Sequence, residues 1–135
     1  MKIYLAASSA DIDRAKHWRD RLVDAGIEVT STWITNVEKV GAANPRDATR
    51  EQRAEWMRGC FREVSSSDVL WFLVPPLDKP TRGAWMEFDY ALEHVQDVFA
   101  SGDTLQSIAC ALADDEYATD EEAFAALVEM ARSAA

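Results

Sequence analysis

Residues 68–74, with the sequence DVLWFLV, decide the fold of this chain. Every residue of this stretch after Asp68 is apolar, and Pro75 and Pro76 follow directly. A short apolar run without polar alternation is typical of a strand that is covered on both faces, as strands of a parallel sheet are. We therefore expect this strand to lie inside a parallel sheet.

Strand-like and helical patterns alternate on either side of this run. Apolar residues recur at helical spacing between residues 12 and 25, which predicts a helix: Ile12, Ala15, Trp18, Leu22 and Ala25. Gly26 follows, and glycine commonly ends a helix. Two capping boxes predict further helix starts, Thr49 with Gln52 and Thr119 with Glu122. The expected strands are residues 2–6, 27–34, 68–74 and 97–101, with a further short strand within 107–112 or near Tyr117. The polar residues 36–47 are predicted to form a long loop.

This alternation implies a doubly wound α/β domain with a mostly parallel sheet of four or five strands. The 135 residues suit one domain, and no linker or repeat divides them, so we expect a single domain over residues 1–135. No apolar run approaches the roughly 20 residues of a membrane span, and the opening residues MKIYLA do not resemble a signal peptide. We expect a cytoplasmic protein that does not bind membranes.

The formal net charge of −10 is unevenly distributed along the chain. Residues 1–86 carry 12 acidic and 13 basic side chains, whereas the remainder carries 12 acidic side chains and only Arg132. Such a surface repels a nucleic-acid backbone, so we expect no polymer partner. The two cysteines, Cys60 and Cys110, fit neither a disulfide framework nor a metal-site spacing, and we expect small core residues there, with no metal and no cofactor.

Glu87 is the most informative polar residue, because it interrupts the opening of an otherwise apolar helix, TRGAWMEFDYAL (residues 81–92). It lies at the edge of an apolar stripe and, by this pattern, in the first helical turn. Burial raises the pKa of such a carboxylate and the helix dipole lowers it, so a partly desolvated but ionised nucleophile is one interpretation. The other interpretation is a first-turn glutamate that helps to cap the helix.

Three motifs in order, KIYLA, SSDVLWFLVP and RGAWMEFDYAL, resemble the nucleoside 2-deoxyribosyltransferase family and its nucleotide N-glycosidase relatives. The segments TSTWI and SIACALADDEYATDEEAF are also similar to small members. The resemblance implies a flavodoxin-like fold, a homo-oligomer, and cleavage of the bond between a base and a (deoxy)ribose. It implies that Glu87 attacks the anomeric carbon and that Tyr4 orients it, with transfer to water or a second base.

The resemblance also suggests how a substrate is bound. Six residues before Glu87, the transferases carry an Asp that meets the sugar, whereas nucleotide-cleaving relatives carry a Ser that meets the 5′-phosphate. Here that position is Thr81, and its hydroxyl, the Arg82 guanidinium and the helix N-terminus at Gly83 together suit a phosphate. Other residues expected to bind the substrate are Ser8, Ser9 and Trp33, the last by stacking on the base. For Ser8 and Ser9 a capping role is the alternative.

The chain also departs from the family pattern. The usual acid that assists the leaving base falls at Cys60, eight positions before Asp68, and Asp89 stands where the motif usually has Gly. Glu51 or Glu55, earlier on the same predicted helix, is a possible substitute for the acid. A non-catalytic nucleotide-binding protein is therefore the alternative function. A receiver-like signalling domain ranks last, because the residues after the first strand, YLAASS, lack its acidic pair.

Overall fold

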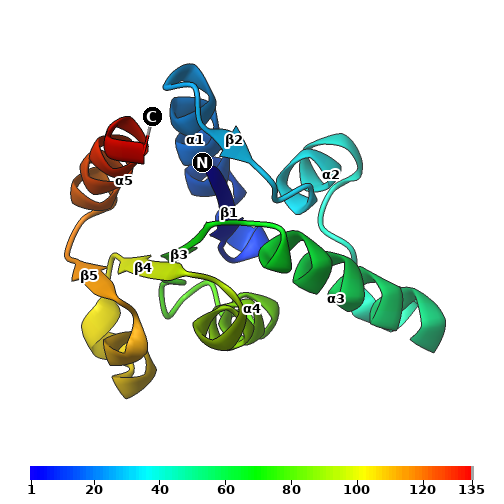
Figure 1. The fold of residues 1–135 in the computed structure, drawn as a ribbon. Coiled ribbons are helices and arrows are strands. Elements are labelled where there is room, and N and C mark those ends of the chain that lie inside the picture. Colours follow the sequence, from blue (N-terminus) through cyan, green and yellow to red (C-terminus); the bar gives the residue numbers. More distant parts are fainter. Residues whose placement is uncertain (135) are drawn as a thin grey trace.

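The structure, a computed structural model, describes residues 1–134 and contains a five-stranded sheet in which all neighbouring strands are parallel (Figure 1). The strand order is β2-β1-β3-β4-β5, which is the flavodoxin-like order of a doubly wound sheet. The predicted α/β fold is therefore confirmed. The strands are β1 (Lys2–Ala6), β2 (Glu28–Val29), β3 (Val69–Leu73), β4 (Asp97–Ser101) and β5 (Asp115–Tyr117).

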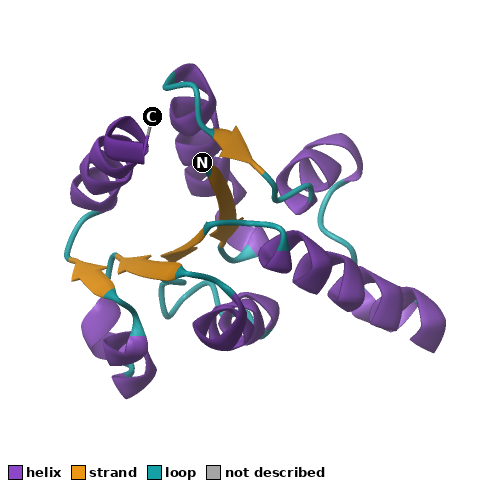
Figure 2. Cartoon of the chain, viewed as in Figure 1, coloured by secondary structure: helices purple, strands orange, loops and turns teal. Residues whose placement is uncertain are grey.

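Helices cover both faces of the sheet (Figures 1 and 2). α1 and α5 lie on one face, and α3 and α4 lie on the other. The capping box of Thr49 and Gln52 is present at the start of α3, as predicted. The helices are α1 (Ile12–Asp24), α2 (Trp33–Val40), α3 (Arg50–Ser65), α4 (Gly83–His94) and α5 (Asp120–Ala134).

The central strand β3 divides the core into two halves. Trp71 faces α1 and α5, whereas Leu70 and Phe72 face α3 and α4, and all three side chains are fully buried. This alternation explains why the β3 sequence is apolar at every position, because each face of the strand meets a layer of helices. On the second face, Phe72 stacks on Phe88 of α4 with 4.8 Å between ring centroids. That packing sets the rotation of α4 about its own axis.

Arg14 of α1 joins three elements at the carboxyl edge of the sheet. Its guanidinium donates to both oxygens of Asp120, at 2.7 and 2.9 Å, and to the carbonyl oxygen of Val74 at 2.8 Å. The Asp120 carboxylate also accepts from the Ser101 hydroxyl and the Trp18 indole, at 2.7 and 3.1 Å. Burial alone raises the pKa of Asp120, but these hydrogen bonds, led by those from Arg14, hold it below its ordinary value.

The region after β2 differs from the sequence prediction. The expected strand over residues 27–34 is only two residues long, and residues 33–40, predicted partly as strand and partly as loop, form α2. The Ser31 hydroxyl accepts a hydrogen bond from the Leu5 backbone N–H at 3.1 Å, so a side chain occupies the place of a strand partner. Ile34 packs into the core, and Gly41, with φ of 79°, follows the end of the helix.

The last predicted strand lies at Asp115–Tyr117, as one of the two sequence alternatives had it. The other alternative, residues 107–112, is wrong, because these residues form a 3-10 turn capped by the Ser107 hydroxyl. The turn is apolar in sequence, but only Cys110 is buried and Ile108 and Leu112 are exposed, so it is not covered on both faces as a buried parallel strand is. The buried thiol of Cys110 agrees with its predicted role as a small core residue.

Replacing Asp120 with alanine is expected to destabilise the fold by about 3 kcal/mol, because it leaves the half-buried Arg14 guanidinium without its main partner. Urea unfolding followed by tryptophan fluorescence measures this change. Glu121→Ala, at the neighbouring exposed position, is the matched control and should change stability by less than about 0.5 kcal/mol. Equal stability of the two variants would show that the Arg14 interactions do not hold α5 to the sheet.

Candidate active site

A cleft of about 740 Å³ opens at the carboxyl edge of β1, between α2, α3 and the start of α4. In doubly wound sheets this is where ligands bind, because the connections on either side of such a switch point leave towards opposite faces. The lining comes from four segments that are far apart in the sequence. The lining residues include Ser9 after β1, Trp33 and Val37 of α2, Trp56, Cys60 and Glu63 of α3, and Thr81, Gly83 and Glu87 around α4.

Glu87 reaches this cleft from a nearly buried position, with 7% of the residue exposed. Its neighbours on α4, Ala84, Phe88 and Ala91, are packed against the sheet, so the carboxylate is carried by a face that the core fixes. α4 begins at Gly83, which places Glu87 in the second turn rather than in the first. The predicted first-turn position is therefore wrong, and a capping role for Glu87 does not fit this helix.

The position of Glu87 determines its charge state. Burial raises the pKa of Glu87 to about 8, the neighbouring Tyr4 hydroxyl opposes the increase, and the negative charge of Glu63 adds to it. The helix dipole acts mainly on the first turn, so it does little to offset the desolvation. In the free protein at neutral pH, Glu87 is therefore mostly protonated. This corrects the sequence interpretation of an ionised carboxylate.

Tyr4 of β1 lies beneath the cleft, fully buried, with its hydroxyl near both the Glu87 carboxyl group and the Cys60 thiol. Burial, followed by the charge of Glu87, raises the pKa of Tyr4 well above its ordinary value, so the hydroxyl keeps its proton. Its geometry towards Glu87 is not that of a regular hydrogen bond, and the oxygen has no fully formed partner within residues 1–134. Tyr4 is therefore a donor that a small movement aligns with Glu87 or with a bound ligand.

Two side chains of α3, Cys60 and Glu63, line the same cleft as Glu87. Burial and the charge of Glu87 raise the pKa of the Cys60 thiol to about 11, which makes Cys60 a weak acid. The Glu63 carboxylate accepts from the Thr32 backbone N–H at 3.1 Å and from the Thr32 hydroxyl at 2.7 Å. Sequence reasoning missed Glu63, although it lies three residues after Cys60 and so on the same helical face.

The two acids that the sequence suggested as substitutes for Cys60 lie elsewhere on α3. Glu55 lines the outer part of the cleft and accepts a hydrogen bond from Arg62 at 2.6 Å. That hydrogen bond lowers the pKa of Glu55, so its carboxylate is ionised at neutral pH. Glu51 does not line the cleft.

Aromatic side chains form part of the cleft wall. Trp33 lines it and is anchored by a hydrogen bond from its indole N–H to the Leu5 carbonyl oxygen at 2.9 Å. Trp56 of α3 also lines the cleft and is 48% exposed. Trp71 is fully buried, and its indole donates to the Ser101 hydroxyl, so it belongs to the core. The sequence pattern did not single out Trp56.

The residues predicted to bind a phosphate are not all in the cleft. Ser9, Thr81 and Gly83 line it, and the first N–H groups of α4 have no side-chain cap. Ser8 is 1% exposed and its hydroxyl accepts from the Ala10 N–H at 3.3 Å, which is the capping alternative. Arg82 is exposed, precedes α4 and is not part of the lining.

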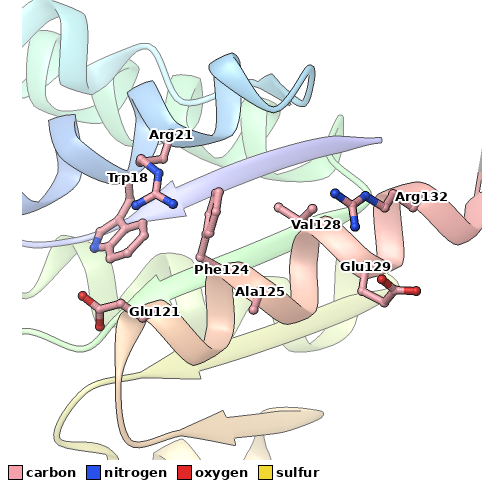
Figure 3. A pocket seen from close by; sticks show the side chains of 8 residues that line it. All are labelled: Trp18, Arg21, Glu121, Phe124, Ala125, Val128, Glu129 and Arg132. Carbon is pink, nitrogen blue, oxygen red and sulfur yellow. The ribbon is translucent and has the colours of Figure 1, made fainter.

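A second groove, of about 490 Å³, lies between α1 and α5 (Figure 3). The Arg21 guanidinium lies 4.5 Å from the Phe124 ring centroid and 5.6 Å from that of Trp18. This packing of a cation on aromatic rings accounts for the position of Arg21. The groove contains no nucleophile comparable to Glu87, and the site is therefore assigned to the larger cleft.

Within residues 1–134, the structure has no group of three or more His, Cys, Asp or Glu side chains arranged to hold a metal ion. None of the helices in that part of the chain combines the length and the apolar character that a membrane span requires.

The overall fold is similar to that of a solved CMP N-glycosidase, BcmB, from Clostridium botulinum, with a TM-score of 0.54. The two chains are 12% identical, and the alignment covers 94% of this chain and 98% of that one. No family model matches the sequence, and no curated protein matches it. At this low identity the similarity shows a common fold, over nearly the full length of both proteins.

Replacing Glu87 with glutamine is expected to stabilise the protein increasingly as the pH rises from 5 to 8.5. The pKa of Glu87 increases from 4.5 to about 8 on folding, so above pH 4.5 the unfolded chain loses a proton that the folded chain retains. Ionisation therefore costs the folded state about 3 to 5 kcal/mol above pH 8, a cost that glutamine avoids. Melting temperatures of both proteins across this pH range measure the effect, and a pH-independent difference would contradict it.

Proposed function

We propose that this protein cleaves the N-glycosidic bond of a (deoxy)nucleoside or its 5′-monophosphate, with Glu87 as the nucleophile. The observation that carries the proposal is a buried glutamate, fixed by core packing, that opens into a large cleft at the switch point of the sheet. The shared fold with a CMP N-glycosidase and the order of the three sequence motifs point to the same chemistry.

In the proposed reaction an ionised Glu87 oxygen attacks the anomeric carbon, and the bond from that carbon to the base nitrogen breaks. The resulting glycosyl ester is then resolved by water or by a second base, as in retaining glycosidases. The Tyr4 hydroxyl lies beside Glu87 and opposes the increase in its pKa, and in this proposal a small movement lets it donate to the carboxylate and orient it. The positive charge that develops on the sugar in the transition state favours the ionised form of Glu87.

The remaining lining residues fit a monophosphate. The Thr81 hydroxyl, the uncapped N–H groups from Gly83 onwards and the Ser9 hydroxyl provide donors for a 5′-phosphate. Arg82, beside this group, adds positive charge at longer range. Trp33, held by its hydrogen bond to Leu5, offers a flat surface on which the base stacks.

A second candidate function is nucleotide binding without cleavage. It is favoured by the protonated state of Glu87 in the free protein and by the weak acidity of Cys60 where relatives have an acid. Both functions predict nucleotide binding, and only the first predicts release of a free base.

Incubation with ribo- and deoxyribonucleosides and their 5′-monophosphates, followed by chromatography, is expected to show release of a free base. Glu87→Ala should reduce the rate at least about 1,000-fold, because it removes the attacking oxygen, without loss of the fold. Asp89→Ala, on the exposed face of the same helix, is the matched control and should retain activity. Survival of activity in Glu87→Ala would refute the nucleophile assignment, and binding without release would favour the second function.

The pH dependence of kcat/KM tests the role of Tyr4. Because attack depends on the charge state of Glu87, the pH dependence of kcat/KM should show the titration of this carboxyl group at about pH 8. Tyr4→Phe removes the hydroxyl that opposes the raised pKa of Glu87, so the midpoint of this titration should move to higher pH. A profile that keeps its midpoint in Tyr4→Phe would show that the hydroxyl does not interact with the nucleophile.

A further inference from the structure

The proposed cleavage needs a proton for the leaving base, and the residue at the usual position of the family's acid cannot supply it readily. Cys60 is a thiol with a pKa of about 11, and its side chain is partly buried beside Tyr4. A neutral purine or pyrimidine is a poor leaving group unless it is protonated as the bond breaks. The cleft must therefore offer another acid if it cleaves ordinary nucleotides.

We propose that Glu63 is this acid: it protonates the leaving base and later removes a proton from the attacking water. This inference rests on the proposed function. Glu63 lies three residues after Cys60, on the same face of α3, and lines the cleft together with Glu87. It is also close enough to both groups for its charge to raise the pKa of Glu87 and of Cys60.

Thr32 holds Glu63 in a way that suits an acid that must also act as a base. The backbone N–H of Thr32 donates to one carboxylate oxygen of Glu63 and fixes the side chain. The other oxygen contacts the Thr32 hydroxyl at 2.7 Å. A hydroxyl group can donate to a carboxylate or accept from a carboxylic acid, so this contact persists when Glu63 gains or loses its proton.

No other group near Glu87 fits the role as well. Tyr4 and Cys60 hold their protons too tightly, because burial raises the pKa of both. Glu55 is kept ionised by Arg62, whose guanidinium donates to it at 2.6 Å. Of the carboxyl groups that line the cleft within residues 1–134, Glu63 is thus the one besides Glu87 that is held by Thr32 and not by an Arg or Lys side chain.

The proton balance follows from two neighbouring carboxyl groups that share one proton. In the free protein the proton is on Glu87. With substrate bound, this proton passes to Glu63; the ionised Glu87 then attacks the anomeric carbon, and Glu63 gives the proton to the base nitrogen as the glycosidic bond breaks. Water then attacks the glycosyl ester, Glu63 takes a proton from that water, and the sugar leaves with the new hydroxyl group.

Glu63→Gln tests this assignment with two kinds of substrate. The first is the neutral-base monophosphate that the wild-type protein cleaves best. The second has a cationic base that leaves without a proton, represented by nicotinamide mononucleotide and 7-methylguanosine 5′-monophosphate. Glu63→Gln should reduce kcat on the neutral base by roughly 100- to 10,000-fold and on a cationic base by less than about 10-fold. Glu87→Gln should abolish cleavage of both.

The pH profile gives a second readout that does not depend on how well a cationic base fits the cleft. With the neutral base, wild-type kcat/KM should fall above about pH 8, where the pair of carboxyl groups loses the proton that it shares, and this limb should be absent in Glu63→Gln. Glu51→Gln, on the same helix but outside the cleft, is the matched control. Circular dichroism and melting curves show that each variant is folded.

The inference is overturned if Glu63→Gln loses the same factor on both kinds of substrate, keeps normal activity on the neutral base, or retains the high-pH limb. These results leave the proposed function standing, because the wild-type protein still releases base and Glu87→Gln does not. Absence of base release by the wild-type protein overturns the proposed function, and the role of Glu63 with it.

Discussion

The candidate site depends on the buried carboxyl group of Glu87, which is carried by a helix whose rotation about its own axis is fixed by packing. α4 is locked to the sheet by Ala84, Phe88 and Ala91, and Phe88 stacks on Phe72 of the central strand. Rotating Glu87 into solvent would expose Phe88, which costs more than desolvating a carboxyl group that can keep its proton. The core therefore imposes both the position of Glu87 and the increase in its pKa to about 8.

The carboxyl edge of the sheet thus carries two charged clusters of opposite character. Around Arg14, opposite charges are paired and hydrogen-bonded, and the pKa of Asp120 is held below its ordinary value. Around Glu87, the carboxylate of Glu63 from α3 adds to the increase in the pKa of Glu87, and no cation within residues 1–134 opposes it. The first arrangement stabilises the ends of β3 and β4 and the start of α5, whereas the second stores a proton where a ligand can bind. The paired charges at this edge thus stabilise the fold, whereas the carboxyl groups without a cationic partner serve the proposed function.

The sequence predicted the parts of this protein that depend on local patterns. The apolar run of β3, the capping box at Thr49 and the apolar stripe of α4 gave the parallel sheet, α3 and the inward position of Glu87. It failed where tertiary contacts override local preference. A hydroxyl of Ser31 replaces a strand partner and ends β2 early. The hydrogen bonds between Thr32 and Glu63 join residues 31 positions apart, so no local spacing in the sequence predicts them.

The charges around Tyr4 suit a thiol, instead of an acid, at position 60. An acid at that position would lie beside the Tyr4 hydroxyl and face Glu87, and with Glu63 it would make three carboxyl groups within one partly buried region. Each added like charge favours protonation of its neighbours, so a third carboxyl group would raise the pKa of Glu87 further and leave less nucleophile at neutral pH. A thiol with a pKa of about 11 fills the same space without charge. The proton that this thiol cannot supply is then provided three residues later on α3, where Thr32 fixes Glu63 at the wall of the cleft.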